Sequence, residues 1–302
     1  MLGGEEPASW PVRPHILHAL RFATSLGTFM TQPTVFVRQL GSGPNVICLH
    51  TSAGNSSQWR GLMDLLAPSF QVAAPDFYGD GKSPPLREDR EFDWDHDIEL
   101  VQPLLDASAP FHLVGHSYGG AVAVRIALNQ PEKVLSLSLY EPALWGLLEA
   151  NWPEEDGTQE IASVRRALVG HVLAGNVEAG CEGFIDYWTG PGNWKRTPDE
   201  RKPTLAASVR ACGLKWIRQL GYPLSPTELT RLPRRMLVLQ GTKTTNAARA
   251  VVRHMRELLP GVRFEALDGL DHMGPVTHGA IVNQHIANFL QSISSQPWSS
   301  DA

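Results

Sequence analysis

Short apolar runs alternate with amphipathic stretches along the first half and the last quarter of the chain. The runs have the length of buried β-strands, and the stretches between them repeat apolar residues at the spacing of one helix face. Strands are predicted at 35–40, 45–50, 70–74, 111–114, 134–140, 236–240 and 262–267. Helices are predicted at 58–67, 93–107, 246–259 and 280–293, with a weaker helical pattern at 15–26. This alternation predicts an α/β protein, with a mostly parallel central sheet flanked by helices.

The alternation stops between residues 142 and 232. This segment has helical patches without a strong strand, and it holds five of the nine tryptophans. We therefore expect an inserted helical domain at 142–232, with residues 34–141 and 233–293 forming the α/β core. Residues 1–33 are predicted to form an N-terminal arm and helix, and residues 294–302 a tail. Within the core, the glycine-rich turn at 41–44 predicts a β-hairpin between the first two strands.

The segment around Ser117 carries the strongest local signal in the chain. The strand at 111–114 runs into Gly115-His116-Ser117-Tyr118-Gly119, and a helical pattern rich in alanine and valine follows to about residue 129. Because glycine has no Cβ, Gly115 and Gly119 let the chain reverse sharply and let the helix start close against the strand. A serine at the apex of such a turn points outward with backbone N–H groups beside it, which is typical of a nucleophile.

Composition and charge narrow the classes of function. The net charge of −5 and the pI near 6.1 give no basic stripe, so we expect no nucleic-acid partner. The chain has no apolar run of about 18 residues and no signal-peptide pattern, so we expect no membrane partner. Cys48, Cys181 and Cys212 are odd in number and far apart, which argues against a disulfide framework or a metal pair. We predict a cytoplasmic protein without a metal or a cofactor.

Five spaced signals give the sequence a resemblance to the α/β-hydrolase superfamily. They are His50 with Trp59 on the next helix, Pro75-Asp76 with Gly79-Asp80-Gly81 and Ser83, the turn at Ser117, Tyr140-Glu141-Pro142, and Gly269-Leu270-Asp271-His272-Met273-Gly274-Pro275. The resemblance covers residues 34–293 and implies the α/β-hydrolase fold, with a helical cap at 142–232 after the family's sixth strand. It also implies a serine esterase with a catalytic triad, a nucleophile elbow and an oxyanion hole.

The resemblance gives Ser117 the role of nucleophile and His272 the role of base. A serine hydroxyl becomes an effective nucleophile when a neighbouring base removes its proton. His272 lies in a glycine-flanked loop after a strand, where the family has its catalytic histidine. We interpret His50 and His116 as residues that orient loops, and His278 is the alternative base.

The acid of the triad departs from the commonest family pattern. In most relatives it follows the seventh strand as Gly-x-x-Asp, but this chain has Gly241-Thr242-Lys243-Thr244-Thr245 there, without a carboxylate. A second arrangement in the superfamily has the acid just after the sixth strand, where this chain has Glu141. We predict that Glu141 accepts the other ring N–H of His272 and stabilises the imidazolium. The alternatives are Asp76, Asp268 and Asp271.

The resemblance also implies an oxyanion hole made of two backbone N–H groups. One belongs to Tyr118, the residue after the nucleophile, and the other to Ser52, in the loop after His50. The family usually has a glycine directly after this histidine, whereas this chain has Thr51.

A serine nucleophile forms an acyl-enzyme, so the predicted reaction is hydrolysis of carboxylic esters of small apolar molecules. Trp145, Phe184 and Trp188 are the candidate substrate-binding residues, although aromatic residues of a cap equally form its own core. A lactonase or a carbon–carbon bond hydrolase with the same triad is the alternative enzyme. A non-catalytic ligand receptor on the same fold is the alternative outside the enzymes. The sequence leaves a homodimer open.

Overall fold

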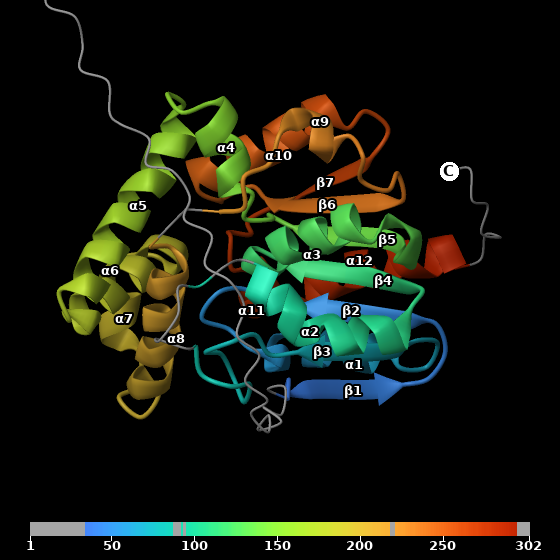
Figure 1. Cartoon of the computed structure of the whole chain (residues 1–302), viewed down its shortest axis with the longest axis horizontal. Coiled ribbons are helices and arrows are strands. Elements are labelled where there is room, and N and C mark those ends of the chain that lie inside the picture. Colours follow the sequence, from blue (N-terminus) through green and yellow to red (C-terminus); the bar gives the residue numbers. More distant parts are fainter. Residues whose placement is uncertain (1–33, 87–91, 93–94, 218–220, 295–302) are drawn as a thin grey trace, which may run out of the picture. The chain divides into compact units, whose positions relative to one another are not determined.

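The computed structural model describes residues 34–86, 92, 95–217 and 221–294, so the predicted helix at 15–26 lies outside the described residues. Seven strands in these ranges form one sheet, in the order β1-β3-β2-β4-β5-β6-β7 (Figure 1). β1 runs antiparallel to β3, and every other neighbouring pair is parallel. The strands are β1 (Val37–Gly41), β2 (Asn45–Leu49), β3 (Gln71–Pro75), β4 (Phe111–His116), β5 (Val134–Tyr140), β6 (Met236–Gly241) and β7 (Arg263–Leu267).

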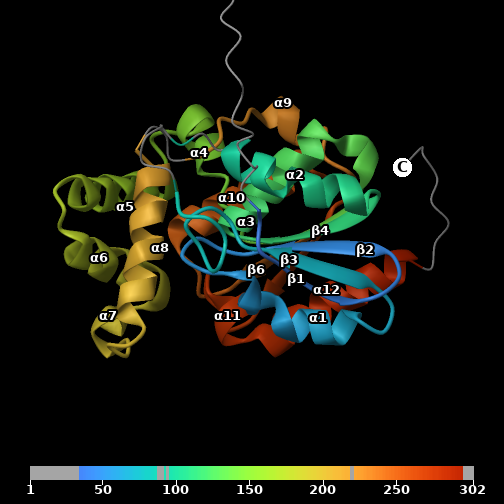
Figure 2. The same ribbon diagram turned by 60° about the horizontal axis from the view of Figure 1, so that its bottom comes forward.

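Helices cover both faces of the sheet (Figure 2). One face carries α1 (Arg60–Leu66) and α12 (Gly279–Ser294), and the other carries α2 (Asp95–Ser108), α3 (Tyr118–Asn129) and α10 (Asn246–Leu258). Alternate residues of β2 point to opposite faces of the sheet and pack in different hydrophobic cores. Ile47 and Leu49 belong to one core, and Val46 and Cys48 belong to the other. The predicted mostly parallel sheet flanked by helices is therefore confirmed. The shorter elements of the core are η1 (Ser56–Trp59), η2 (Pro131–Lys133) and α11 (Gly274–Thr277).

The predicted hairpin between β1 and β2 is wrong, because β3 lies between these two strands. Val37 of β1 pairs with Pro75 of β3, and β2 pairs with β3 on one side and β4 on the other. The turn itself is present, with φ of +84° at Gly41 and +121° at Gly43. β2 is buried along nearly its whole length and so takes a strand on each side, whereas the half-exposed β1 suits the edge of the sheet.

Residues 142–232, which we call the helical segment, form helices and no strand in their described part. Four of these helices, α5 to α8, lie together beyond the carboxyl ends of the parallel strands (Figure 1). The loops that follow those strands therefore face the helical segment. Its helices are α4 (Trp145–Asn151), α5 (Asp156–Leu173), α6 (Val177–Thr189), α7 (Asn193–Arg196), α8 (Lys202–Lys215) and α9 (Pro226–Leu229).

None of the described helices combines the length and the apolar character needed to cross a bilayer. The cytoplasmic location and the homodimer stay predictions.

Candidate active site

Ser117 lies at the turn between β4 and α3, in a strained backbone conformation. Its φ of 51° and ψ of −115° fall in a region that few residues with a side chain adopt. The Ser117 N–H donates to the carbonyl of Tyr140 at 3.0 Å, and the Ser117 carbonyl accepts the N–H of Ala143 at 2.9 Å. A Cβ on Gly119 would lie 2.3 Å from the carbonyl oxygen of Leu49, so only glycine fits this close approach. These contacts fix the serine at the carboxyl edge of the sheet.

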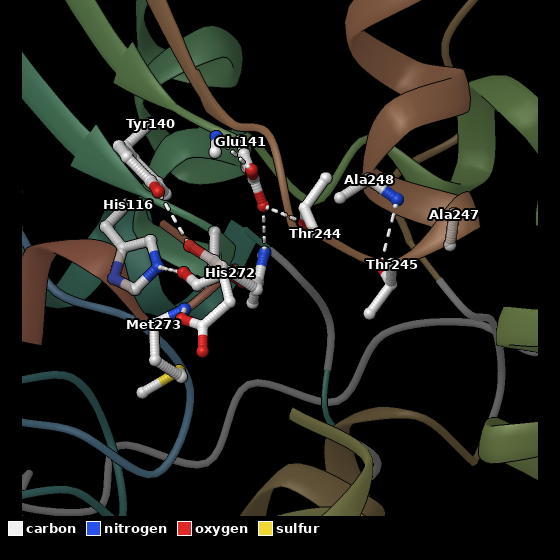
Figure 3. Close-up of polar contacts among 12 residues, drawn as sticks. His116, Tyr140, Glu141, Thr244, Thr245, Ala247, Ala248, His272 and Met273 are labelled. Carbon is white, nitrogen blue, oxygen red and sulfur yellow. Dashed lines mark hydrogen bonds and ion pairs between the residues drawn. The ribbon is translucent and has the colours of Figure 1, made fainter. Parts of the chain in front are cut away.

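The hydroxyl of Ser117, the ring of His272 and the carboxylate of Glu141 form one hydrogen-bonded chain. His272 Nε2 lies 2.8 Å from Ser117 Oγ. On the other side of the ring, His272 Nδ1 lies 2.7 Å from Oε2 of Glu141 (Figure 3). Glu141 and His272 are buried, with 0% and 2% of their surface exposed. Because Nδ1 faces a carboxylate, this nitrogen carries the proton, and Nε2 is left to accept the proton of the serine hydroxyl.

Ser117, Glu141 and His272, far apart in sequence, thus lie in contact, whereas the alternative residues make other hydrogen bonds. His278 is exposed, and its Nδ1 bonds to the neighbouring Thr277 hydroxyl. Asp271 accepts the N–H of Met273, and Asp268 accepts the hydroxyl of Thr242. Asp76 accepts two backbone N–H groups from the loops around it.

Glu141 accepts three hydrogen bonds, one from the last residue of β6, one from the loop after β6 and one from His272. Its Oε1 accepts the Gly241 N–H at 2.8 Å, and its Oε2 accepts the Thr244 hydroxyl at 2.6 Å as well as the His272 Nδ1–H. The segment from Gly241 to Thr245, which lacks the family's usual carboxylate, thus supplies two donors to a carboxylate that follows the neighbouring strand β5. Sequence reasoning missed Thr244. The signal that could have found it is its position, because a hydroxyl there lies beside the end of β5.

His116 holds the backbone of the loop that carries His272. Burial lowers the pKa of His116 well below its ordinary value, so its ring is neutral, with one donor and one acceptor nitrogen. Its Nε2–H donates to the carbonyl of His272 at 2.8 Å (Figure 3). Its Nδ1 accepts from the amide of Gln58 at 3.2 Å. The hydroxyl of Tyr140 donates to the carbonyl of Asp271 at 2.6 Å. The loop is therefore held at two consecutive carbonyl groups, those of Asp271 and His272.

The loop after β2 is held by the core despite the threonine in place of the usual glycine. The Thr51 N–H donates to Oε1 of Gln58 at 3.3 Å, and the Thr51 carbonyl accepts the Gly54 N–H at 3.1 Å. The positive φ falls on Ala53, at 54°, rather than on Thr51. Burial lowers the pKa of His50 to about 4, and its neutral ring donates from Nδ1 to the Thr51 carbonyl.

A cavity of about 550 Å³ opens over Ser117 and His272. Ser52 and Tyr118, the two predicted oxyanion residues, both line it. All three candidate substrate-binding residues line it as well, from the helical segment, and they also pack against one another. The apolar part of its wall also includes Ile185, Leu205, Trp216 and Met273, and the polar part includes Asn193, Arg196 and Arg201.

A buried charge cluster beside the turn at Ser117 was not predicted. Lys215 of α8 lies 2.7 Å from Oδ2 of Asp97 on α2, and the hydroxyl of Tyr118 donates to the same oxygen at 2.5 Å. Oδ2 of Asp80 lies 4.0 Å from the Lys215 ammonium. Burial raises the pKa of Asp80 to about 7, against the attraction of Lys215, which lowers it. The members come from four separate parts of the chain, so no local pattern reveals the cluster.

The sheet, the strained serine and the hydrogen-bonded chain define a protein of the α/β-hydrolase class. Residues 46–284 match the alpha/beta hydrolase family, and the chain belongs to that family. The predicted fold and family are therefore confirmed.

Individual relatives share the fold at low identity. The chain is 28% identical, over 255 residues, to the pimeloyl-[acyl-carrier protein] methyl ester esterase of Aeromonas hydrophila, covering 81% of this chain and 94% of that one. The structure of the enol-lactonase from Burkholderia xenovorans superposes with a TM-score of 0.64 at 16% identity, covering 85% of this chain and 96% of that one. The thermophilic esterase from Thermogutta terrifontis superposes with a TM-score of 0.62 at 20% identity, covering 86% and 93%.

Proposed function

We propose that the protein cleaves carboxylic esters of small apolar molecules through an acyl-enzyme, with Ser117, His272 and Glu141 as its catalytic triad. The observation that carries the proposal is the chain of two hydrogen bonds from Ser117 Oγ through His272 to Glu141. The protein is a hydrolase that acts on ester bonds, as its sequence predicts. The name of the Aeromonas hydrophila relative, a methyl ester esterase, agrees with this chemistry.

In the acylation step, Ser117 Oγ attacks the ester carbonyl while its proton moves to Nε2 of His272. Glu141 accepts the Nδ1–H throughout, so it fixes the tautomer and stabilises the imidazolium that forms. The imidazolium then gives its proton to the leaving alcohol as the bond to the acyl carbon breaks. In the deacylation step, His272 takes a proton from a water molecule as the water oxygen attacks the acyl carbon. The imidazolium then returns this proton to Ser117 Oγ as the bond between Oγ and the acyl carbon breaks, which releases the acid and restores the free serine.

The oxyanion of each tetrahedral intermediate needs donors that are already oriented. The backbone N–H groups of Ser52 and Tyr118 have this role in the proposal, and both residues line the cavity beside Ser117. The loss of one such donor costs about 2.7–4 kcal/mol of transition-state stabilisation. The contacts of Thr51 and the strained turn of Ser117 hold the two loops before substrate arrives.

The cavity favours an apolar substrate. Trp145, Phe184 and Trp188 present aromatic surface to it, and in the proposal they bind the acyl or the alcohol portion of the ester. A short or medium acyl chain fits a space of about 550 Å³, which is within the usual range for small-molecule sites.

The test is labelling with a fluorophosphonate probe, followed by mass spectrometry of the adduct. We expect an adduct on Ser117 in the wild-type protein and none in Ser117→Ala, with a parallel loss of p-nitrophenyl ester hydrolysis. Folded wild-type protein that neither labels nor hydrolyses any ester would favour the receptor. Turnover of lactones, with esters left intact, would instead favour the lactonase.

A further inference from the structure

The face of the His272 ring is covered by a side chain from the helical segment. Trp188 of α6 stacks on it, with ring centroids 4.2 Å apart and planes inclined by 30°. Trp188 is itself buried, with 8% of its surface exposed. The two nitrogens on the edge of the imidazole already contact Ser117 and Glu141. Residues of the α/β core thus supply the hydrogen-bond partners of both ring nitrogens, and the helical segment covers a face of the ring.

The indole of Trp188 is held in this place by other aromatic rings. Trp145 stacks against it at 6.1 Å, and the edge of Tyr187 meets it at 4.5 Å. Tyr187 is fixed in turn, because its hydroxyl donates to Glu160 of α5 at 2.7 Å. Phe184, one turn earlier on α6, meets the indole edge-on at 6.2 Å. The stacked geometry is therefore supported from two other helices as well as from α6.

A stacked indole acts differently on the two protonation states of the imidazole. The face of an aromatic ring carries negative electrostatic potential and attracts a cation, and indole is the strongest of the side chains in this respect. In the proposed reaction, His272 is neutral before attack and cationic in the transition state. Its contact with the indole therefore strengthens at the moment when the Ser117 proton is transferred.

We propose that Trp188 is a positioning residue of the reaction, which stabilises the protonated His272 and holds its ring between Ser117 and Glu141. This inference rests on the proposed function. It gives the helical segment a part in proton transfer in addition to its contribution to the cavity wall.

The other titratable groups around the His272 ring are left in place when Trp188 is replaced. Among the described residues, Glu141 faces the ring from the end of β5, and His116 of β4 faces it at 5.3 Å. Asp271 adjoins it in sequence and accepts the Met273 N–H. His116 stays neutral because of its burial. A change in the pH dependence of a Trp188 variant therefore reports the loss of the indole.

The experiment compares Trp188→Leu, which keeps apolar volume without an aromatic face, with Trp188→Phe, which keeps a weaker face. Trp194→Leu is the matched control, because Trp194 is a buried tryptophan of the same segment that lies outside the cavity lining and bonds to Glu178. The measurements are kcat and KM for p-nitrophenyl esters, the pH profile of kcat/KM, and thermal unfolding of each variant.

We expect Trp188→Leu to lower kcat about two- to fivefold and to move the acid limb of the kcat/KM profile about half a pH unit lower. The acid limb moves this way because an imidazolium without its indole loses its proton more readily. Trp188→Phe should show the same changes at smaller size, and it carries the test alone if the leucine variant does not fold. Trp194→Leu should leave both quantities unchanged.

A higher KM with unchanged kcat and acid limb would show that Trp188 is only a wall of the cavity, and would overturn the inference. An acid limb that moves to higher pH would overturn it too, because that result means the indole acts only by excluding water. Failure of the proposed function looks different, since wild-type protein would then neither hydrolyse esters nor label at Ser117.

Discussion

Asp80 should make the protein less stable as pH rises, and Asp80→Asn should remove this effect. The carboxyl is 4% exposed, and its Oδ1 has no hydrogen-bond partner among the described residues. Burial raises its pKa from 3.8 to about 7, although Lys215 and the Ser208 hydroxyl favour the charged form. Asp97 and Asp76 add to the increase in this pKa. Ionisation of Asp80 in the folded protein is therefore unfavourable overall.

The sign and size follow from proton linkage. Between pH 4 and pH 7 the folded chain keeps the Asp80 proton while the unfolded chain loses it, so the free energy of unfolding falls as pH rises. The pKa difference is about three units, and each unit corresponds to about 1.36 kcal/mol. Above pH 7 the ionisation of Asp80 lowers the free energy of unfolding by up to about 4 kcal/mol. An asparagine has the shape of the protonated acid and does not ionise, so the variant avoids this cost.

The assay is urea unfolding of the wild type and of Asp80→Asn at several pH values from 4 to 9. We expect the two to agree near pH 4 and the variant to become progressively more stable, with a plateau above pH 7. Asp64→Asn is the matched control, because Asp64 is exposed on α1, and its curve should follow the wild type. A stability difference that does not vary with pH, or an Asp80→Asn variant that is less stable at pH 8, would refute the reasoning.

Three further predictions concern the triad, its support and the thiols. Glu141→Gln should lower kcat for p-nitrophenyl esters by about four orders of magnitude, and activity within tenfold of wild type would move the acid elsewhere. Thr244→Val should lower the free energy of unfolding by about 1.5–3 kcal/mol in urea titrations, because it removes a donor to the buried carboxylate of Glu141. Thr244→Ser keeps the hydroxyl and should lower the free energy of unfolding by less than about 1 kcal/mol. Burial raises the pKa of Cys212 to about 12 and of Cys181 to about 11, and it raises the pKa of the buried Cys48 further, so none of the three thiols should react with Ellman's reagent before unfolding.

The sequence predicted the elements of the sheet well because a buried parallel strand leaves a short apolar run. Its prediction of β5 matches the structure at both ends, and β6 differs by one residue. Pairing between strands leaves a weaker trace in the sequence. The glycine-rich turn after β1 suggested a hairpin, but the pattern does not show that β3, which follows α1, returns to lie between β1 and β2.

The positions of Ser117, Glu141 and His272, the residues of the proposed triad, follow from a related rule. The carboxyl ends of parallel strands meet at one edge of the sheet, so motifs after β4, β5 and β7 gather there whatever their distance in sequence. Thr244 follows the same rule, because it lies just after β6, the strand beside β5. A threonine in a loop carries no signal of its own that it donates to Glu141.

The contacts of Trp188 with His272 and of Lys215 with Asp97 are made by helices. The positions of the strand ends therefore do not predict them. Trp188 lies on a helix whose apolar positions indicate only that they are buried, and the same pattern would fit a core residue that never meets His272. Lys215 reads as an ordinary charge near the end of α8, yet it is 5% exposed and paired with Asp97. A buried pair of this kind is costly to break by removing one partner, since the other charge is then left without compensation. Tyr118, which donates to the same carboxylate, is also a residue of the proposed oxyanion hole. The docking of α8 and the position of the turn at Ser117 therefore depend on one shared oxygen atom of Asp97, a coupling that exists only in the folded chain.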